Sequence, residues 1–274
     1  MSDPIIGMQQ WFETPPGRYL LAWERSEFER AVGDIFGYHA LQLGLPEIDA
    51  LQANRMPHKW LAVQEPLPAG APGAALSLPA GFAARPALVT DFAALPFEES
   101  SLDLVVLPHS LELNHDPHAT LREVERVLVP EGRLVICCLN PASLWGLKQR
   151  RAHLYRSFGV GELYLPHAGE FIGHWRLRDW LRLLSFEVES ASFGCYRPAM
   201  KSQQWLDRYG WMDQVGERWW PIFGAAYFLV AVKRVRGVKL IGKMWRPSAG
   251  IATAPVPLAN RTHRAHAQPQ RKSL

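Results

Sequence analysis

Cysteines are few in this chain, and long hydrophobic runs are missing. Only Cys137, Cys138 and Cys195 occur among the 274 residues, and the first two are adjacent. Three cysteines cannot build a disulfide framework, so we expect reduced thiols and a cytoplasmic protein. The longest apolar run, 222–232, is much shorter than the ~20 residues that a membrane-spanning helix needs. We therefore expect no transmembrane segment, and a buried strand at that run.

Signals for export and for zinc binding are also missing. The first residues, Met1-Ser2-Asp3-Pro4, have neither the basic segment nor the following apolar run of a signal peptide, so none is expected. No group of histidines and cysteines has the sequence spacing of a zinc site, and we therefore predict no metal.

Acidic residues are absent from the end of the chain. The last one is Glu217, and from Lys233 onward ten Lys and Arg residues occur without any Asp or Glu. Of the 30 basic residues, 20 precede Lys233, against all 26 acidic ones, which leaves that part with a net charge of −6. Residues 246–274 lack apolar periodicity and are expected to be a basic, disordered tail. The tail has few aromatic residues to stack on bases, so no specific nucleic-acid binding is predicted.

The stretch from Leu88 to Leu139 carries the strongest structural pattern. It contains three apolar runs, Leu88–Thr90, Leu102–Leu107 and Arg133–Leu139, and an amphipathic helical segment precedes the third. Apolar runs of this length, without alternation and separated by helices, are typical of a parallel sheet that is covered on both faces. This pattern predicts an α/β domain.

The same stretch carries three motifs in a fixed order: Asp91 followed by Leu95-Pro96-Phe97, then Ser101-Leu102-Asp103-Leu104-Val105, then the segment from Leu121 to Leu134. Each motif is weak alone, but their order makes the combination specific. It resembles the type 11 methyltransferase domain of class I S-adenosylmethionine-dependent methyltransferases. The resemblance implies a three-layer, Rossmann-like α/β fold whose seven-stranded sheet is parallel except for an antiparallel last strand.

The resemblance also implies a domain organisation. We expect a helical extension at 1–37, a methyltransferase-like domain at 38–235 with an insertion or lid at 141–220, and the tail described above. The seven strands are predicted near 39–43, 60–64, 87–90, 102–107, 133–139, 186–190 and 225–232.

The loop after the first predicted strand departs from the family pattern. In the family this loop is rich in glycine, which lets the backbone approach the methionine end of the cofactor. Here only Gly44 remains; Gln42 takes the place of an acidic residue, and Leu45-Pro46 follows. Pro46 has no N–H to donate. The sequence therefore leaves two hypotheses: a methyltransferase with an atypical loop, or a catalytically inactive fold that serves as a binding or scaffold protein.

The resemblance assigns S-adenosyl-L-methionine to the carboxyl ends of the strands. The glycine borders the cofactor, an acid after strand two accepts the ribose hydroxyls, and an acid and a backbone N–H after strand three bind adenine. The corresponding residues are Gly44, Glu65, Asp91 and Phe92. Leu107 lies at the end of strand four, where members of the family contact the cofactor and the substrate.

Alternatives stay open for three of the polar residues. Glu65 is also explained as a loop carboxylate, and Asp91 as the start of an Asx-turn. His109 is a candidate general base because its pKa lies near neutrality, but a loop histidine without a catalytic role explains it as well. Asp103 matches a family position with a structural role. The acceptor, the partners and the oligomeric state are not identified, because methyl transfer depends on alignment and many members have no dedicated catalytic residue.

Overall fold

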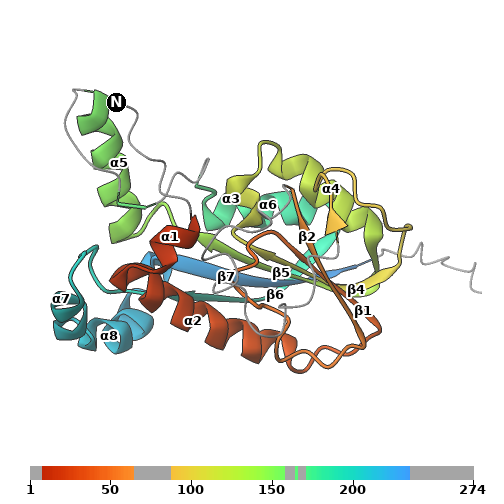
Figure 1. Ribbon diagram of the computed structural model, residues 1–274, viewed down its shortest axis with the longest axis horizontal. Coiled ribbons are helices and arrows are strands. Elements are labelled where there is room, and N and C mark those ends of the chain that lie inside the picture. Colours follow the sequence, from red (N-terminus) through yellow and green to blue (C-terminus); the bar gives the residue numbers. More distant parts are fainter. Residues whose placement is uncertain (1–7, 65–87, 158–163, 166–170, 235–274) are drawn as a thin grey trace, which may run out of the picture. The chain divides into compact units, whose positions relative to one another are not determined.

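The computed structural model describes residues 8–64, 88–157, 164–165 and 171–234, drawn in colour in Figure 1. Glu65 and the tail at 246–274 lie outside the described residues. No helix within these ranges has the length and apolar character needed to cross a membrane.

The centre of the described part is a seven-stranded sheet with the order β3-β2-β1-β4-β5-β7-β6. β7 is antiparallel to β5 and β6, and the other pairings are parallel. The strands are β1 (His39–Leu43), β2 (His58–Val63), β3 (Leu88–Val89), β4 (Leu102–Pro108), β5 (Leu128–Leu139), β6 (Phe186–Gly194) and β7 (Ala226–Lys233). The predicted fold class, and the predicted parallel neighbours β4 and β5, are confirmed.

Strand β5 begins five residues earlier than predicted. Leu102 pairs with Leu128, whereas Leu104 already pairs with Arg133, so the register shifts between these two pairs. The extra residues contain the expected turn at 130–132, and Glu131 has a positive φ of 64°. The turn is therefore accommodated as an irregularity within the strand rather than as a break before it.

Helices cover both faces of the sheet (Figure 1). They are α1 (Met8–Phe12), α2 (Pro15–Val32), α3 (Ser110–Leu113), α4 (Pro117–Val127), α5 (Leu144–Ser157), α6 (His174–Leu183), α7 (Gln203–Arg208), α8 (Trp211–Trp219) and the 3-10 turn η2 (Pro221–Phe223). Figure 1 places α2 on one side of the sheet and α3, α4 and α6 on the other.

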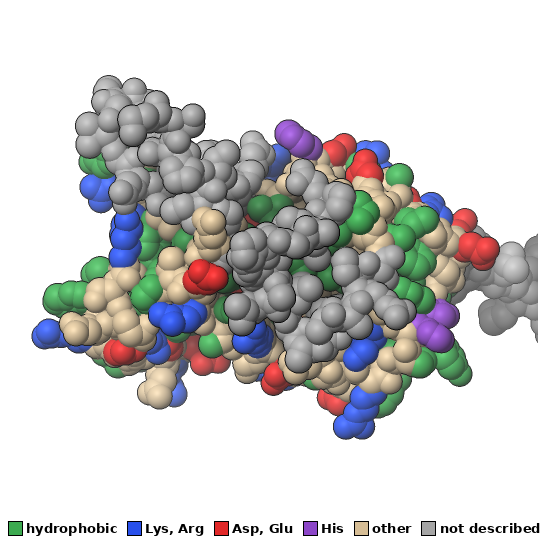
Figure 2. All heavy atoms as spheres, viewed as in Figure 1, with side chains coloured by type: hydrophobic (Ala, Val, Ile, Leu, Met, Phe, Trp, Pro, Cys, Tyr) green, Lys and Arg blue, Asp and Glu red, His purple; other side chains and the backbone are tan. Residues whose placement is uncertain are grey.

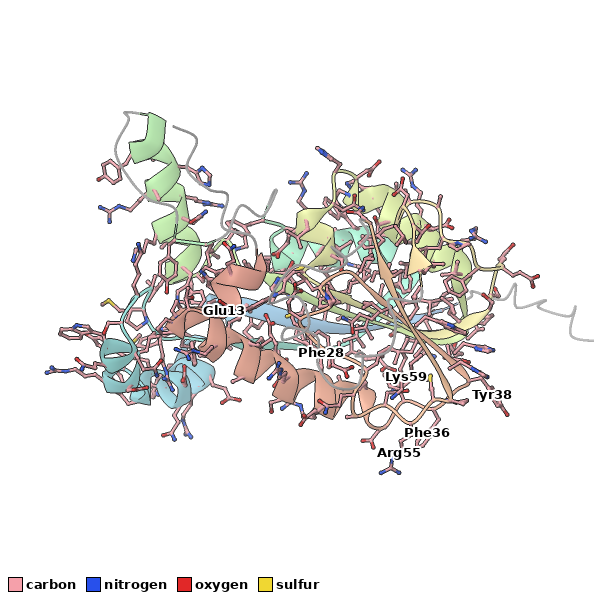
Figure 3. All side chains as sticks on the ribbon, in the orientation of Figure 1. Glu13, Phe28, Phe36, Tyr38, Arg55 and Lys59 are labelled. Atoms are coloured by element: carbon pink, nitrogen blue, oxygen red, sulfur yellow. The ribbon has the colours of Figure 1, made fainter. Side chains whose placement is uncertain are left out.

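The two layers have separate apolar cores. Strand β4 directs Leu104 and Val106 into the core shared with α2, and Val105 and Leu107 into the core shared with α4 and α6. Figure 3 labels Phe28 on α2, whose ring packs edge-on against Phe228 of β7 at 4.9 Å between centroids. Burial of both faces explains why this strand reads as a continuous apolar run.

Local signals set the starts of two long helices. Thr14 precedes α2 and accepts a hydrogen bond from the N–H of Gly17, while Asp116 precedes α4 and accepts one from Ala119. Each helix then begins with proline, which has no N–H to leave unpaired at that position.

On the face drawn in Figure 2, basic and acidic side chains are intermixed over the described surface.

Candidate functional site

The parallel strands bring two predicted residues together at one edge of the sheet. Gly44 follows β1 and has a φ of +74°, and Phe92 follows β3. A Cβ built on Gly44 would lie 3.6 Å from the ring of Phe92 and 3.0 Å from the Oγ atom of Ser110. Gly44 therefore sits in a tight space between the ends of β3 and β4, where open α/β sheets bind ligands.

The loop after β1 is organised by the buried side chain of Gln42. Its two Nε2–H groups are shared among the carbonyl oxygens of Gly44, Leu45 and Ile48, which lie 3.2, 3.0 and 2.7 Å from the nitrogen. Its Oε1 atom accepts the N–H of Ala50 at 3.0 Å. Leu45 and Ile48 are buried in the core on the α2 side of the sheet. The loop thus uses its carbonyl groups internally and packs its apolar side chains inward.

The turn after β3 has the opposite character. Asp91 is exposed, and its Oδ1 atom accepts the N–H of Ala93 at 2.9 Å, which confirms the Asx-turn. The second carboxylate oxygen makes no hydrogen bond to any residue that the structure describes. One oxygen of the Asp91 carboxylate is therefore unpaired among the described residues, in the turn that also carries Phe92.

Helix α4 holds the segment that follows this turn. Glu123 accepts the N–H of Leu95 at 2.9 Å, and Arg126 donates to the carbonyl oxygens of Leu95 and Phe97 at 3.2 and 2.9 Å. Arg126 also pairs with Glu123 and lowers the pKa of that carboxyl group. The Leu-Pro-Phe motif is thus a turn that a helix clamps in place.

Two other positions named from the sequence, Leu107 and Asp103, do not face the edge that carries Gly44 and Phe92. The side chain of Leu107 is fully buried in the core against α4 and α6, so it does not face the edge. Asp103 accepts the N–H groups of Tyr38 and His39 at 2.8 and 2.9 Å, which confirms its structural role at the start of β1.

His109 is completely buried and has a carboxylate on each side. Its Nε2 atom lies 2.6 Å from Glu24, and its Nδ1 atom lies 2.9 Å from Glu112. Burial alone would lower the pKa of His109, but the two carboxylates outweigh burial and raise it to about 10. Burial raises the pKa of Glu112, which also accepts the N–H of Leu139. Both ring nitrogens are therefore engaged by buried carboxylates, and the side chain is closed off from solvent.

Sequence reasoning missed Glu24, which is 85 residues from His109 and 113 residues from Cys137. The thiol of Cys137 lies 3.5 Å from the same Glu24 oxygen that faces His109. A signal was present, because Leu20, Glu24 and Phe28 recur every four residues on the buried stripe of α2. A carboxylate in such a stripe indicates a buried partner.

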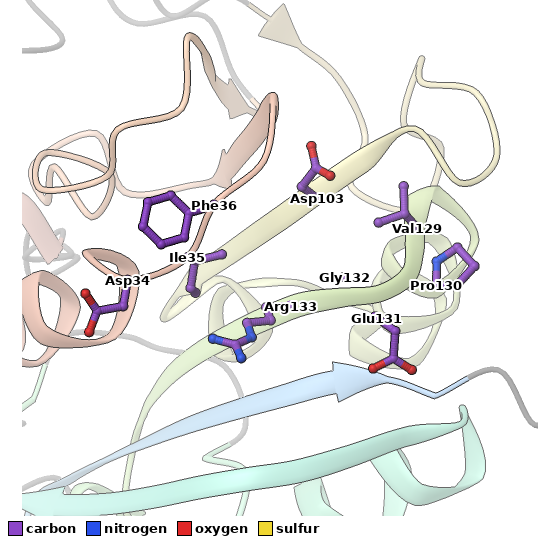
Figure 4. Close-up of a pocket in the computed structure, with 9 residues that line it drawn as sticks. All are labelled: Asp34, Ile35, Phe36, Asp103, Val129, Pro130, Glu131, Gly132 and Arg133. Atoms are coloured by element: carbon purple, nitrogen blue, oxygen red, sulfur yellow. The ribbon is translucent and has the colours of Figure 1, made fainter.

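A separate hollow lies at the opposite edge of the sheet (Figure 4). It is about 360 Å³ in volume, and it is formed by residues 34–36, Asp103 and residues 129–133. These residues stand at the amino ends of β4 and β5, away from Gly44 and Asp91. The hollow is therefore separate from the edge that carries Gly44 and Phe92.

Comparisons of sequence identify one domain and one relative. A sequence model of a methyltransferase domain family matches residues 76–136. The uncharacterized protein YafS of Escherichia coli strain K12 is 40% identical over 98 residues, which make up 36% of this chain and 38% of YafS. The match thus spans less than half of the relative's length.

Comparisons of structure extend over most of the chain. A methyltransferase in complex with the Trm112 methyltransferase activator of Haloferax volcanii has a TM-score of 0.52 and 16% identity, over 84% of this chain and 99% of that one. A protein from Thermotoga maritima, described as a possible histamine N-methyltransferase, also has a TM-score of 0.52, with 13% identity over 82% and 94% of the two chains. At such identities the likeness concerns the fold.

Proposed function

We propose that this chain, which has the class I methyltransferase fold and a methyltransferase domain match at 76–136, is an S-adenosylmethionine-dependent methyltransferase. The observation that carries the proposal is the exposed carboxylate of Asp91, which keeps one oxygen free and directly precedes Phe92, the residue whose ring lies close to Gly44. Ligands of open α/β sheets bind at this edge, and an acid there can accept the amino group of adenine.

The residues present fit the cofactor at its adenine end. Asp91 would accept a hydrogen bond from the adenine amino group, and Phe92 would border the base. Glu65 is the candidate acceptor for the ribose hydroxyls. The space for the methionine end of the cofactor is narrower, because Ser110 lies against Gly44. The hydrogen bonds from Gln42 also hold the loop after β1 in its present path. We therefore expect binding that is weaker than is typical of the family.

The bound cofactor would supply an electrophilic methyl group, and the protein would mainly align the acceptor and exclude water. Asp91 and Phe92 serve binding in this proposal, and neither has to move a proton. His109 was the candidate general base, but its burial between two carboxylates favours a positioning role behind the edge. The acceptor is left unassigned.

The three cysteines bear on the cellular location of the protein. All three cysteines are free and buried, which supports a reducing compartment, and we propose the cytoplasm. The domain bounds at 38–235, the insertion at 141–220 and the tail at 246–274 also remain proposals.

Calorimetric titration of the full chain with S-adenosylmethionine and S-adenosylhomocysteine tests the function. We expect saturable binding of both ligands. A folded protein that binds neither ligand at millimolar concentration would contradict the proposal, and it would favour the second hypothesis of a non-catalytic binding or scaffold protein.

A further inference from the structure

Three potential metal ligands converge under the carboxyl edge of the sheet. A carboxylate oxygen of Glu24, the Nε2 atom of His109 and the Sγ atom of Cys137 all lie within 4.8 Å of one another. They come from α2, from the residue after β4 and from β5, and all three residues are completely buried. We refer to Glu24, His109 and Cys137 as the buried cluster.

The hydrogen bonds of the buried cluster leave one acceptor unused. The Oε2 atom of Glu24 is buried and has no hydrogen-bond partner among the described residues. A buried carboxylate oxygen without a partner is costly, and native proteins nearly always satisfy such atoms or coordinate them to a cation. Oε2 of Glu24 is therefore the polar atom of the buried cluster that hydrogen bonds within the described part of the chain leave unpaired, and a bound cation would satisfy it.

The far side of His109 is arranged as in metal sites. Its Nδ1 atom faces Glu112 at 2.9 Å, and Glu112 is fixed in turn by the N–H of Leu139. A histidine that binds a metal through one nitrogen usually donates the other N–H to a carboxylate, which fixes the tautomer and the ring orientation. The backbone of His109 is also strained, with a φ of +50°, and such strain concentrates at functional positions.

We propose that the buried cluster binds one zinc ion as a closed structural site. The combination of thiolate, imidazole and carboxylate suits Zn²⁺, whereas Mg²⁺ and Ca²⁺ prefer oxygen ligands alone. Both oxygens of Glu24 with His109 and Cys137 complete four coordination positions. Coordination requires a thiolate and a free Nε2 lone pair, so zinc binding releases the thiol proton of Cys137 and any proton on His109 Nε2 to solvent.

Such an ion would join α2 to the ends of β4 and β5. His109 precedes Ser110, whose hydroxyl donates to the carbonyl oxygen of Leu43 and lies against Gly44. The site would thus support the cofactor edge from behind. It does not depend on the proposed activity, because a non-catalytic fold could carry the same ion.

Metal analysis of the full-length protein tests this site with a matched pair of variants. The protein is produced with zinc, dialysed against a weak chelator and measured by mass spectrometry for metals. Cys137 and Cys138 are both fully buried on β5, but they face opposite cores, so only one thiol points into the cluster. Cys137→Ser and Cys138→Ser make the same chemical change at similar burial. We expect about one zinc per chain in wild type and Cys138→Ser, and at least a fivefold loss in Cys137→Ser.

Cobalt substitution gives a second readout that needs no variant to fold. Co²⁺ in the wild-type site should show a thiolate charge-transfer band, and chelation should lower the melting temperature. A folded wild-type protein that retains neither zinc nor cobalt would overturn the proposal. Equal zinc in all three proteins, without the thiolate band, would also overturn it, because the metal would then be an adventitious ion on the surface.

Discussion

The loop after β1 and the turn after β3 reach the same edge of the sheet, but they treat their polar groups in opposite ways. The loop after β1 satisfies three of its carbonyls through one buried amide, Gln42, and packs inward. The turn after β3 satisfies only one oxygen of Asp91 and leaves the rest of that carboxylate to solvent. The hydrogen bonds of the loop after β1 thus stabilise the loop itself, whereas the turn after β3 keeps one carboxylate oxygen that a ligand could use.

The two segments also differ in how well they match the methyltransferase family. The family match at 76–136 includes the turn after β3 and ends inside β5, whereas the loop after β1 lies outside it. In the loop after β1, the side-chain amide of Gln42 instead bonds three carbonyls of the loop itself. Substitutions at the two segments should therefore have different effects, on stability at one and on ligand binding at the other.

The largest expected effect is that of Gln42→Ala on stability. The change removes four hydrogen bonds and leaves several buried groups of the loop without partners, each worth ~1–3 kcal/mol. We expect the free energy of unfolding to fall by about 3 kcal/mol or more in urea titrations. Gln64→Ala is the control, because Gln64 is exposed and makes one long contact of 3.3 Å. Equal losses in the two variants would contradict this account of the loop.

The next effect concerns the turn after β3 and affects ligand binding. Asp91→Ala should weaken S-adenosylmethionine binding by ~1–3 kcal/mol, the range for losing a hydrogen bond to a charged group. Asp91→Asn is the informative partner, because asparagine keeps the Asx-turn to Ala93 but has no charge. We expect its melting temperature to stay near wild type while its affinity falls. Unchanged affinity in both folded variants would remove Asp91 from the site.

Gly44→Ala should have a smaller effect, again on stability. The φ of +74° costs an alanine roughly 1–2 kcal/mol, and the new Cβ would press on Ser110. Gly33→Ala is the control, because that position has an ordinary φ of −61° at the end of α2 and, among the described residues, its Cβ would approach just a carbonyl oxygen of that helix. A Gly44→Ala variant as stable as the control would mean that the loop readily changes its path.

The sequence was sufficient for the fold because the central strands β1, β4 and β7 and most of β5 are buried on both faces. Continuous apolar runs in β4 and β5 and the motif order between Asp91 and Leu134 specify a parallel sheet with little ambiguity. The start of β5 was wrong, because turn residues at 130–132 also fit an irregularity inside a strand.

The local geometry of the candidate site could be predicted only where a residue bonds within its own segment. Asp91 belongs to this class, since its turn lies within four residues. The role of Gln42 was not predicted, because the bonds that close its loop depend on a path that no spacing specifies. The buried cluster was missed for a related reason: a fold, rather than a motif, brings Glu24 to His109 and Cys137.

The smallest expected effect concerns Arg126 of α4, which lies outside both segments but contacts the residues that follow the turn after β3. Arg126 clamps the turn after β3 by donating to Leu95 and Phe97 while it pairs with Glu123. In Arg126→Lys the charge stays, but a single ammonium cannot replace the planar fork, so we expect a stability loss of ~1 kcal/mol. Cofactor affinity should fall less than in Asp91→Asn, because the free oxygen of Asp91 is untouched. Arg122→Lys, an exposed change on the same helix, is the control in both measurements. A larger affinity loss in Arg126→Lys than in Asp91→Asn would show that the clamp, rather than the free carboxylate, determines binding at this edge.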